Sequence, residues 1–274
     1  HGGIGAPNAG YGPSDMPLCY GSIYAPSNYG SNGSTRQTDE HGGGGAIRLD
    51  VGGALVFNGT ITANATPGGY TTGAGGSVYI RAGSISGTGT VSANSLNTSN
   101  NGTQLQNGGV GAGGRIAIVL TGKDADFSKF DPTTQLSAKS VNTYYTPARV
   151  YASGTVYVET AADAPNEGWL IIDGGVGVPV PDRRMCNGAA VTGTDGGTVH
   201  FSKITLTNGA KAVVPPGVTL DIRGTTFDGT STETVKYGIY LFGGDVLGSD
   251  DCTVGYEIVG AGGTITAKKL TVAE

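Results

Sequence analysis

Clustered carboxylates are the first residues of this chain that could do chemistry. Asp245, Asp250 and Asp251 stand close together, and Glu257 follows them. Calcium binds about six to eight oxygen ligands, which carboxylates on a loop can supply. Calcium at Asp245, Asp250 and Asp251 is therefore one interpretation of this stretch, and a solvated acidic loop is the other.

A second acidic group consists of Asp124, Asp126 and Asp131. Two lysines stand among these aspartates, and the stretch has no glycine for the sharp turn of a calcium loop. We therefore interpret this group as a solvated loop.

Four tyrosines precede residue 30 among glycines, prolines and serines, namely Tyr11, Tyr20, Tyr24 and Tyr29. Aromatic rings provide a large contact area at little entropic cost, so an exposed group of them could stack on sugars. The alternative is that the four rings pack over the first strands and close the end of the fold.

Basic and aromatic residues offer a third chemistry, acid–base catalysis on polysaccharides. Lyases of this kind use a Lys, Arg, His or Tyr base, and the candidates here are Tyr144, Tyr145, Arg149, Lys203 and Arg223. No spacing connects these residues, so no catalytic residue is assigned. His1 and His41 could together chelate copper, but a polar turn is the better explanation of His41, which precedes a glycine run.

The composition excludes several classes of protein. The 274 residues include 51 glycines, and 16 Lys and Arg stand against 21 Asp and Glu, which leaves a net charge of −5. Nucleic-acid binding needs clustered cations, so this class is excluded. No run reaches the ~18 apolar residues of a membrane span. The glycines cluster instead of recurring at every third position, which excludes collagen.

Internal repeats organise the first half of the chain. Four similar segments begin the repeats, at 44–51, 75–82, 113–118 and 154–159, and similar second segments follow at 59–64, 89–94 and 135–139. Aliphatic residues alternate with polar ones in these segments, which is the pattern of β-strands. One such unit is too small to bury its own apolar face, whereas stacked copies bury a continuous core. We therefore expect Ile47, Val78 and Ile116 to lie in one column.

The second half keeps the same pattern with weaker repetition. Further short strands are predicted near residues 169–173, 198–201, 204–206, 218–222, 238–242, 264–267 and 270–272, separated by turns. The stretches 26–45 and 97–114 are rich in Gly, Asn and Ser and are expected to form loops at one corner. The fold prediction is an all-β, right-handed parallel β-helix (β-solenoid). Residues 1–150 form its glycine-rich part, and residues 151–274 form a less regular continuation.

An ordered series of motifs resembles a known family. The motifs are residues 1–5, 20–22 with Pro26, 42–49, 73–77 and 111–118. Together they resemble the glycine-rich β-solenoid modules of large bacterial secreted or surface proteins with an adhesin-like layout. The resemblance covers residues 1–175 and implies an extracellular scaffold or adhesive element without transferable catalytic residues.

These observations predict a structural or adhesive element outside the cell or on its surface, without a cofactor, and with calcium as the alternative. We expect it to associate with itself, because the ends of a β-solenoid carry unpaired backbone groups. A polysaccharide or cell-surface glycan is a further expected partner. The alternatives are a polysaccharide lyase and a carbohydrate-binding module that uses the tyrosines. The missing polar cap and the absence of an initial Met suggest a module of a longer protein.

Overall fold

The computed structural model describes residues 19–33, 42–66, 72–97, 111–142, 149–150, 152–175, 178–179, 188–192, 197–232, 236–255 and 257–272. Within these ranges the protein consists of short β-strands and one helix of four residues, α1 (Pro132–Gln135). The prediction of an all-β protein with parallel strands is confirmed. No helix in the described ranges has the length and apolar character of a membrane span.

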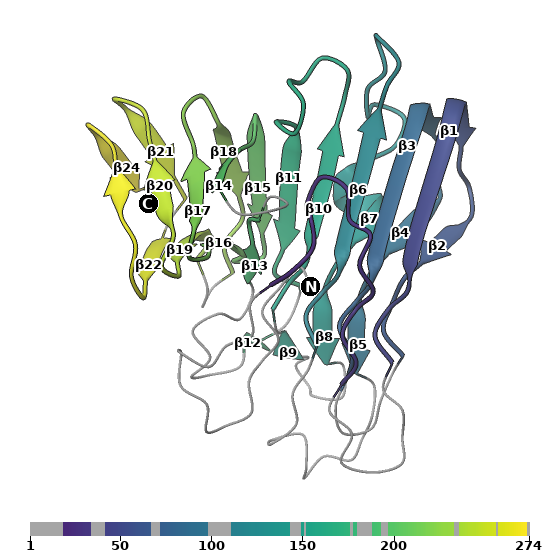
Figure 1. Ribbon diagram of the computed structural model, residues 1–274, viewed down its shortest axis with the longest axis horizontal. Helices are drawn as coiled ribbons and strands as arrows, with labels where there is room; N and C mark the ends of the chain where they lie inside the picture. Colours follow the sequence, from purple (N-terminus) through teal and green to yellow (C-terminus); the bar gives the residue numbers. More distant parts are fainter. Residues whose placement is uncertain are drawn as a thin grey trace.

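A seven-stranded sheet, called the central sheet here, extends through both halves of the chain (Figure 1). Its strands, in spatial order, are β1 (Ala46–Val56), β3 (Ser77–Ser86), β6 (Arg115–Leu120), β10 (Thr155–Glu159), β11 (Trp169–Asp173), β15 (Lys203–Thr207) and β18 (Thr226–Gly229). All neighbours are parallel except β10 and β11, which pair antiparallel. This antiparallel pair differs from the all-parallel order that the sequence suggested.

The repeats of the first half lie in register. Ile47 of β1 is opposite Val78 of β3, Val78 is opposite Ile116 of β6, and Ile116 is opposite Val156 of β10. The side chains of Val78 and Ile116 are fully buried. The expected column of Ile47, Val78 and Ile116 is thus confirmed, with equivalent residues of successive repeats stacked on one another.

Smaller sheets complete the two halves. In the first half they are formed by β2 (Thr60–Thr62), β4 (Thr90–Ser92) and β7 (Leu136–Ser137), and by β5 (Ser95–Asn97), β8 (Ser140–Asn142), β9 (Arg149–Val150) and β12 (Val178–Pro179). The second half has three smaller sheets, of which the first consists of β13 (Gly188–Ala190), β16 (Lys211–Val214), β19 (Gly238–Leu241) and β22 (Glu257–Gly260). The second group is β14 (Gly197–His200), β17 (Val218–Asp221), β20 (Asp245–Leu247) and β23 (Ile265–Thr266), and the third is β21 (Cys252–Val254) with β24 (Leu270–Val272). The strands predicted in the second half are confirmed.

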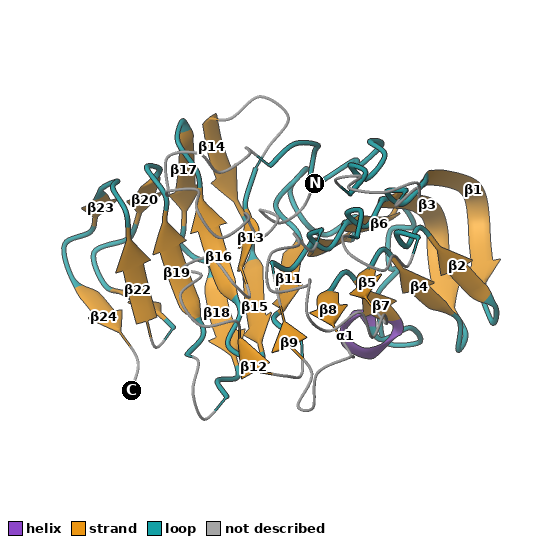
Figure 2. Ribbon diagram, turned by 90° about the horizontal axis from the view of Figure 1, so that it is seen from below, coloured by secondary structure: helices purple, strands orange, loops and turns teal. Residues whose placement is uncertain are grey.

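Two hydrophobic cores lie on opposite faces of the central sheet. One core, called the first core here, contains Val156 of β10 and Ile171 of β11. The other, called the second core, contains their neighbours Tyr157 and Ile172. Neighbouring side chains of a strand point to opposite faces. Figure 2 accordingly shows β2, β4 and β7 on one side of the central sheet and β16, β17 and β19 on the other. Both cores therefore reach the antiparallel pair β10 and β11, and each lies on its own face of the central sheet.

Residues 19–33, which we call the cover segment, lie over the second-core face of β6 and β10 (Figure 1). Ile23 is fully buried in the second core. The ring of Tyr24 meets that of Tyr157 edge to face, with 5.1 Å between the centroids. This segment covers the apolar side chains that β10 would otherwise expose on that face.

A glycine directly precedes each of β1, β3, β6 and β10, and these four glycines form a column. A Cβ on Gly76 would lie 1.9 Å from the carbonyl oxygen of Gly45, one on Gly114 2.1 Å from that of Gly76, and one on Gly154 1.9 Å from that of Gly114. None of these four residues has a positive φ. Glycine is needed here because backbones of successive repeats approach each other closely. Gly45, the first of the column, has open space at its Cβ position.

Candidate functional site

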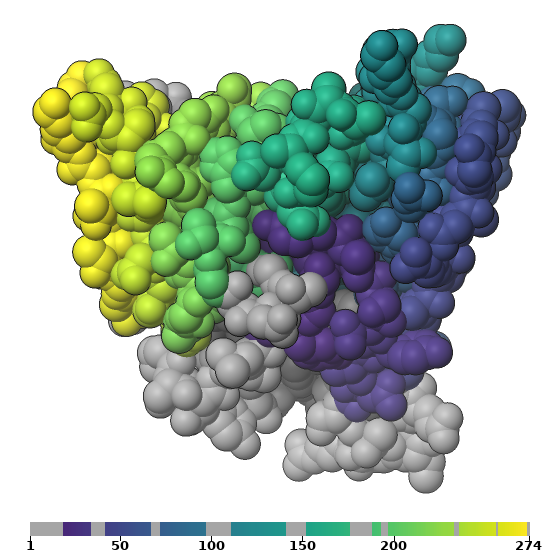
Figure 3. Space-filling model, turned by 45° about the horizontal axis from the view of Figure 1, so that its top comes forward, coloured from purple at the N-terminus to yellow at the C-terminus, as the bar shows by residue number. Residues whose placement is uncertain are grey.

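A groove of about 810 Å³ lies between the cover segment, the turn at 165–167 and the strands β14 and β17. It is lined by Ser22, Tyr24, Ala25, Pro165, Asn166, Glu167, Thr198, Val199, His200, Asp221 and Arg223. In Figure 3 the purple atoms of the cover segment lie against the teal and green atoms of the middle of the chain. Segments far apart in the sequence thus form one polar concavity.

His200 is held at the end of β14 by its neighbour strand. Its Nδ1 lies 2.9 Å from the carbonyl oxygen of Asp221 on β17. A carbonyl oxygen only accepts hydrogen bonds, so Nδ1 carries the hydrogen and donates it. In the neutral ring, Nε2 is then left as a hydrogen-bond acceptor.

Arg223 and Asp221 form a two-point ion pair beside His200. The Nε of Arg223 lies 2.9 Å from Oδ1 of Asp221, and Nη2 lies 2.5 Å from Oδ2. The hydrogen bonds and charge of Arg223 lower the pKa of Asp221 below its ordinary value, although burial acts in the opposite direction. The side chain of Arg223 is 57% exposed, and the remaining N–H groups of its guanidinium are available to a ligand.

The opposite wall of the groove carries acidic groups. Glu167 lines the groove itself. Behind it, the carboxylate of Glu159 accepts hydrogen bonds from the hydroxyl of Tyr157 and, at 2.8 Å, from the backbone N–H of Asn166. Burial raises the pKa of Tyr24 to about 12, and the charges of Glu167 and Glu159 add to this shift. Burial and the bond to Glu159 raise the pKa of Tyr157 as well.

These tyrosines predict a loss of stability at alkaline pH. Below pH 10, the ordinary pKa, Tyr24 is protonated in the folded and unfolded states, so its contribution is complete. As the pH rises toward 12, the unfolded chain releases this proton first, and the free energy of unfolding falls. Tyr24→Phe is expected to make this fall shallower, as measured by urea denaturation across this pH range. The exposed Tyr29→Phe serves as the control, and equal slopes for the two variants would contradict the prediction.

The structure separates the predicted tyrosines. Tyr11 lies outside the described residues. The hydroxyl of Tyr20 donates to the carbonyl oxygen of Tyr29 at 3.0 Å, and these rings are 40% and 73% exposed. Tyr24 instead packs against Tyr157 and Phe201 of the second core and reaches the groove.

The three aspartates considered for calcium each bind a different partner. Asp245 accepts from the backbone N–H of Thr264 at 2.9 Å, whereas Asp250 and Asp251 pair with Lys268 and Lys269 at 3.3 and 2.9 Å. Nowhere in the described part of the chain do three His, Cys, Asp or Glu side chains gather as a metal site would need. Glu257 pairs with Lys211 at 2.8 Å. Calcium at these aspartates stays a prediction.

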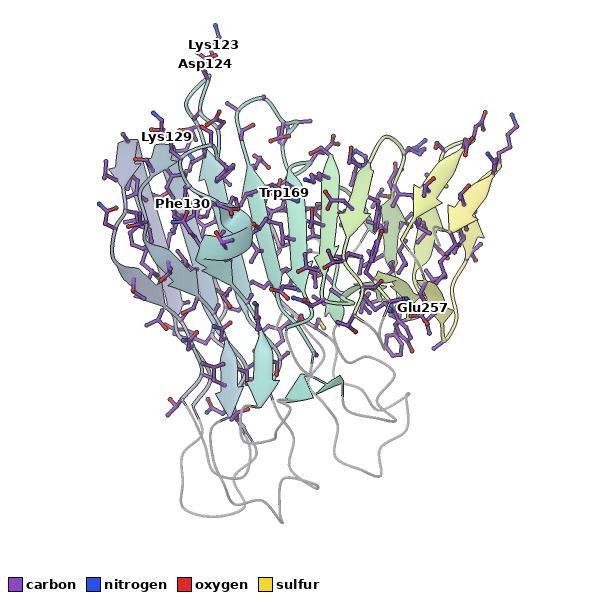
Figure 4. All side chains as sticks on the ribbon, turned by 180° about the vertical axis from the view of Figure 1, so that it is seen from behind. Lys123, Asp124, Lys129, Phe130, Trp169 and Glu257 are labelled. Atoms are coloured by element: carbon purple, nitrogen blue, oxygen red, sulfur yellow. The ribbon has the colours of Figure 1, made fainter. Side chains whose placement is uncertain are left out.

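The other acidic group supports local structure. Asp126 accepts a hydrogen bond from the backbone N–H of Ser128, and Asp131 caps α1 by accepting from that of Thr133. Lys123 and Asp124 lie at the tip of a loop that extends beyond the strands (Figure 4).

The basic candidates also lie apart. Lys203 lies 4.2 Å from the ring centroid of Trp169 and 3.0 Å from a carboxylate oxygen of Asp228, away from the groove that Arg223 lines. Arg149 belongs to β9, and its side chain is not described. Four further candidates lie outside the described residues: Tyr144, Tyr145, His1 and His41. Cys19 and Cys252 are free thiols.

Sequence reasoning identified Arg223 and Tyr24 but did not connect them, and it missed Glu167. These residues meet only because β11 turns back along β10, which brings the 165–167 turn beside β14 and β17. A search against protein-family models, a search of curated proteins and a search of solved structures each found no match.

Proposed function

We propose that this chain is a right-handed β-solenoid that serves as an extracellular structural or adhesive element. The observation that carries the proposal is the in-register ladder of the central sheet, whose strands join both halves of the chain. Paired backbones along a stack and a narrow core resist bending, which suits a scaffold. The proposal also agrees with the resemblance to adhesin-like modules.

Self-association is part of this proposal. Gly76, Gly114 and Gly154 each lie against the preceding repeat, whereas Gly45 has nothing within 4 Å of its Cβ position. The edge of β1 is therefore shaped like the surface on which the other repeats stack. An unpaired edge strand of this kind accepts another strand.

We expect the purified chain to form filaments or higher oligomers, visible by electron microscopy and light scattering. Gly45→Leu should abolish them, because its side chain would begin in open space at the β1 edge and occupy the room that an incoming strand needs. Gly197, whose Cβ position is also open but whose φ is +82°, is unsuitable as a control. The exposed Arg81→Lys on β3, which keeps its charge and lies away from the β1 edge, serves instead. Monomers at all concentrations would contradict the stacking.

A carbohydrate-binding protein is the second candidate function. One observation favours it: Tyr24 and Arg223, both chosen from the sequence for sugar chemistry, line the same groove. This function is compatible with an adhesive scaffold, because an adhesin has to hold a ligand.

A further inference from the structure

We propose that the groove binds a neutral oligosaccharide and discriminates against uronate polymers. This inference rests on the second candidate function, carbohydrate binding, and specifies the class of ligand. It is independent of whether the chain forms filaments.

The size and rigidity of the groove suit a short saccharide chain. Its volume of about 810 Å³ lies within the range of ~300–1,000 Å³ found for ligand pockets. One wall consists of β14 and β17, which pair from Gly197 opposite Val218 to His200 opposite Asp221. The other wall is fixed because Asn166 donates its backbone N–H to the half-buried Glu159, and because Ser202 donates its backbone N–H to the carbonyl oxygen of Glu167. A preformed site of this kind loses little entropy on binding.

The polar groups complement hydroxyls, which both donate and accept hydrogen bonds. The carboxylate of Glu167 accepts, and so does Nε2 of His200 in its neutral form. The N–H groups of Arg223 that do not bind Asp221 donate. The ring of Tyr24 and the side chain of Pro165 add apolar surface for the C–H faces of a sugar.

The charge balance decides between neutral and acidic sugars. Among the described residues, the charged side chains that line the groove are Glu167, Asp221 and Arg223. Both carboxylate oxygens of Asp221 are occupied by Arg223, which neutralises the pair. Within the described part of the chain, no cation pairs with the carboxylate of Glu167, and Glu159 lies directly behind the wall. A uronate would bring a second negative charge to this wall, and like charges repel.

The decisive experiment is calorimetric titration of the whole chain with two panels of hexasaccharides. The neutral panel contains the hexamers of glucose, mannose, xylose and galactose, and the acidic panel contains hexagalacturonate and a hexamer of alginate. We expect at least one neutral hexamer to bind and both acidic hexamers to bind at least about tenfold more weakly. A hexamer of glucosamine tests whether the negative wall instead selects a cationic sugar.

The variants Glu167→Gln and Arg223→Lys are expected to weaken binding of the neutral hexamer about tenfold or more. Both preserve the approximate shape, and Arg223→Lys also preserves the charge that Asp221 needs. The matched control is Arg48→Lys, because Arg48 pairs with Asp50 two residues away, at 2.7 Å, just as Arg223 pairs with Asp221, but far from the groove. Its affinity should stay within about twofold of the original. Circular dichroism of each variant confirms that it folds.

Each result has one meaning. Preferential binding of an acidic hexamer or of the glucosamine hexamer overturns the neutral class but leaves carbohydrate binding intact. Binding of no hexamer overturns both. Neutral binding that the Glu167 and Arg223 variants do not change places the site elsewhere and overturns the assignment to the groove.

Discussion

Gly114→Ala is expected to destabilise the fold by more than about 3 kcal/mol, because a new side chain here meets backbone instead of a movable side chain. Its Cβ would lie 2.1 Å from the carbonyl oxygen of Gly76 and 2.7 Å from the carbonyl carbon of Gly75. The backbone cannot move aside easily. The backbone N–H of Gly114 donates to the carbonyl oxygen of Ala93 at 2.7 Å. The backbone N–H of Arg115 donates to the carbonyl oxygen of Gly76 at 2.9 Å.

The same column provides the control for this prediction. Gly45 stands before β1 as Gly114 stands before β6, but nothing lies within 4 Å of its Cβ position. Gly45→Ala should therefore change the free energy of unfolding by no more than about 1 kcal/mol, and could raise it by restricting the unfolded chain. Urea denaturation followed by circular dichroism measures both variants. If Gly114→Ala and Gly45→Ala have the same midpoint, the close approach of the repeats is wrong.

This contrast explains which part of the fold the sequence could reveal. The first repeats can be recognised in the sequence because the register of the strands places equivalent residues opposite each other. Ile47, Val78 and Ile116 therefore recur with similar neighbours. Glycine recurs in the same way because backbone approach tolerates no side chain. A repeated physical constraint leaves a repeated sequence, and such a pattern is readable.

The reversal at β10 and β11 left no comparable pattern. The segment 154–159 resembles the starts of the earlier repeats, and nothing in it indicates that the next strand returns antiparallel. The consecutive Leu170, Ile171 and Ile172 did carry a signal, because an uninterrupted apolar strand is buried on both faces. That signal shows burial on both faces but no direction. The groove depends on the antiparallel direction of β11. Individual residues of the groove could therefore be named from the sequence, but their meeting in one site could not be predicted.

Arg115 is the second residue whose replacement should have a large effect. It follows Gly114 at the start of β6, in a row where neighbouring strands carry Ala46, Ser77 and Thr155. Its side chain is fully buried. An arginine among such small residues has to reach beyond the sheet to satisfy its N–H groups.

The guanidinium joins three separate parts of the chain. Nη1 donates to the hydroxyl of Thr155 at 3.1 Å, Nη2 to that of Thr192 at 2.9 Å, and Nε to the carbonyl oxygen of Tyr20 at 3.4 Å. No acidic side chain in the described part of the chain forms an ion pair with Arg115. Burial accordingly lowers its pKa to about 10. The buried charge itself opposes folding, so the hydrogen bonds and the packing are what Arg115 contributes.

Arg115→Ser, which installs the residue that β3 carries in this row, should lower the free energy of unfolding by about 3 kcal/mol through lost hydrogen bonds and a void. Arg115→Met fills most of the volume without a charge to desolvate, so its loss should be clearly smaller. The exposed Arg81→Ser on β3 should stay within about 0.5 kcal/mol of the original.

Limited proteolysis shows where the Arg115 variant opens. If Arg115 fastens the cover segment to the central sheet through Tyr20 and Thr192, then in Arg115→Ser residues 19–33 should be cleaved before the strands, at a denaturant concentration where the original chain resists. The Met variant should show the same early cleavage to a lesser degree, because it fills the space but cannot bond to Tyr20. Cleavage that begins in the strands, with the cover segment still protected, would show that Arg115 supports the stack of repeats instead. In that case the cover segment, which carries Tyr24 into the groove, would hold its place without Arg115, and the groove would not depend on Arg115.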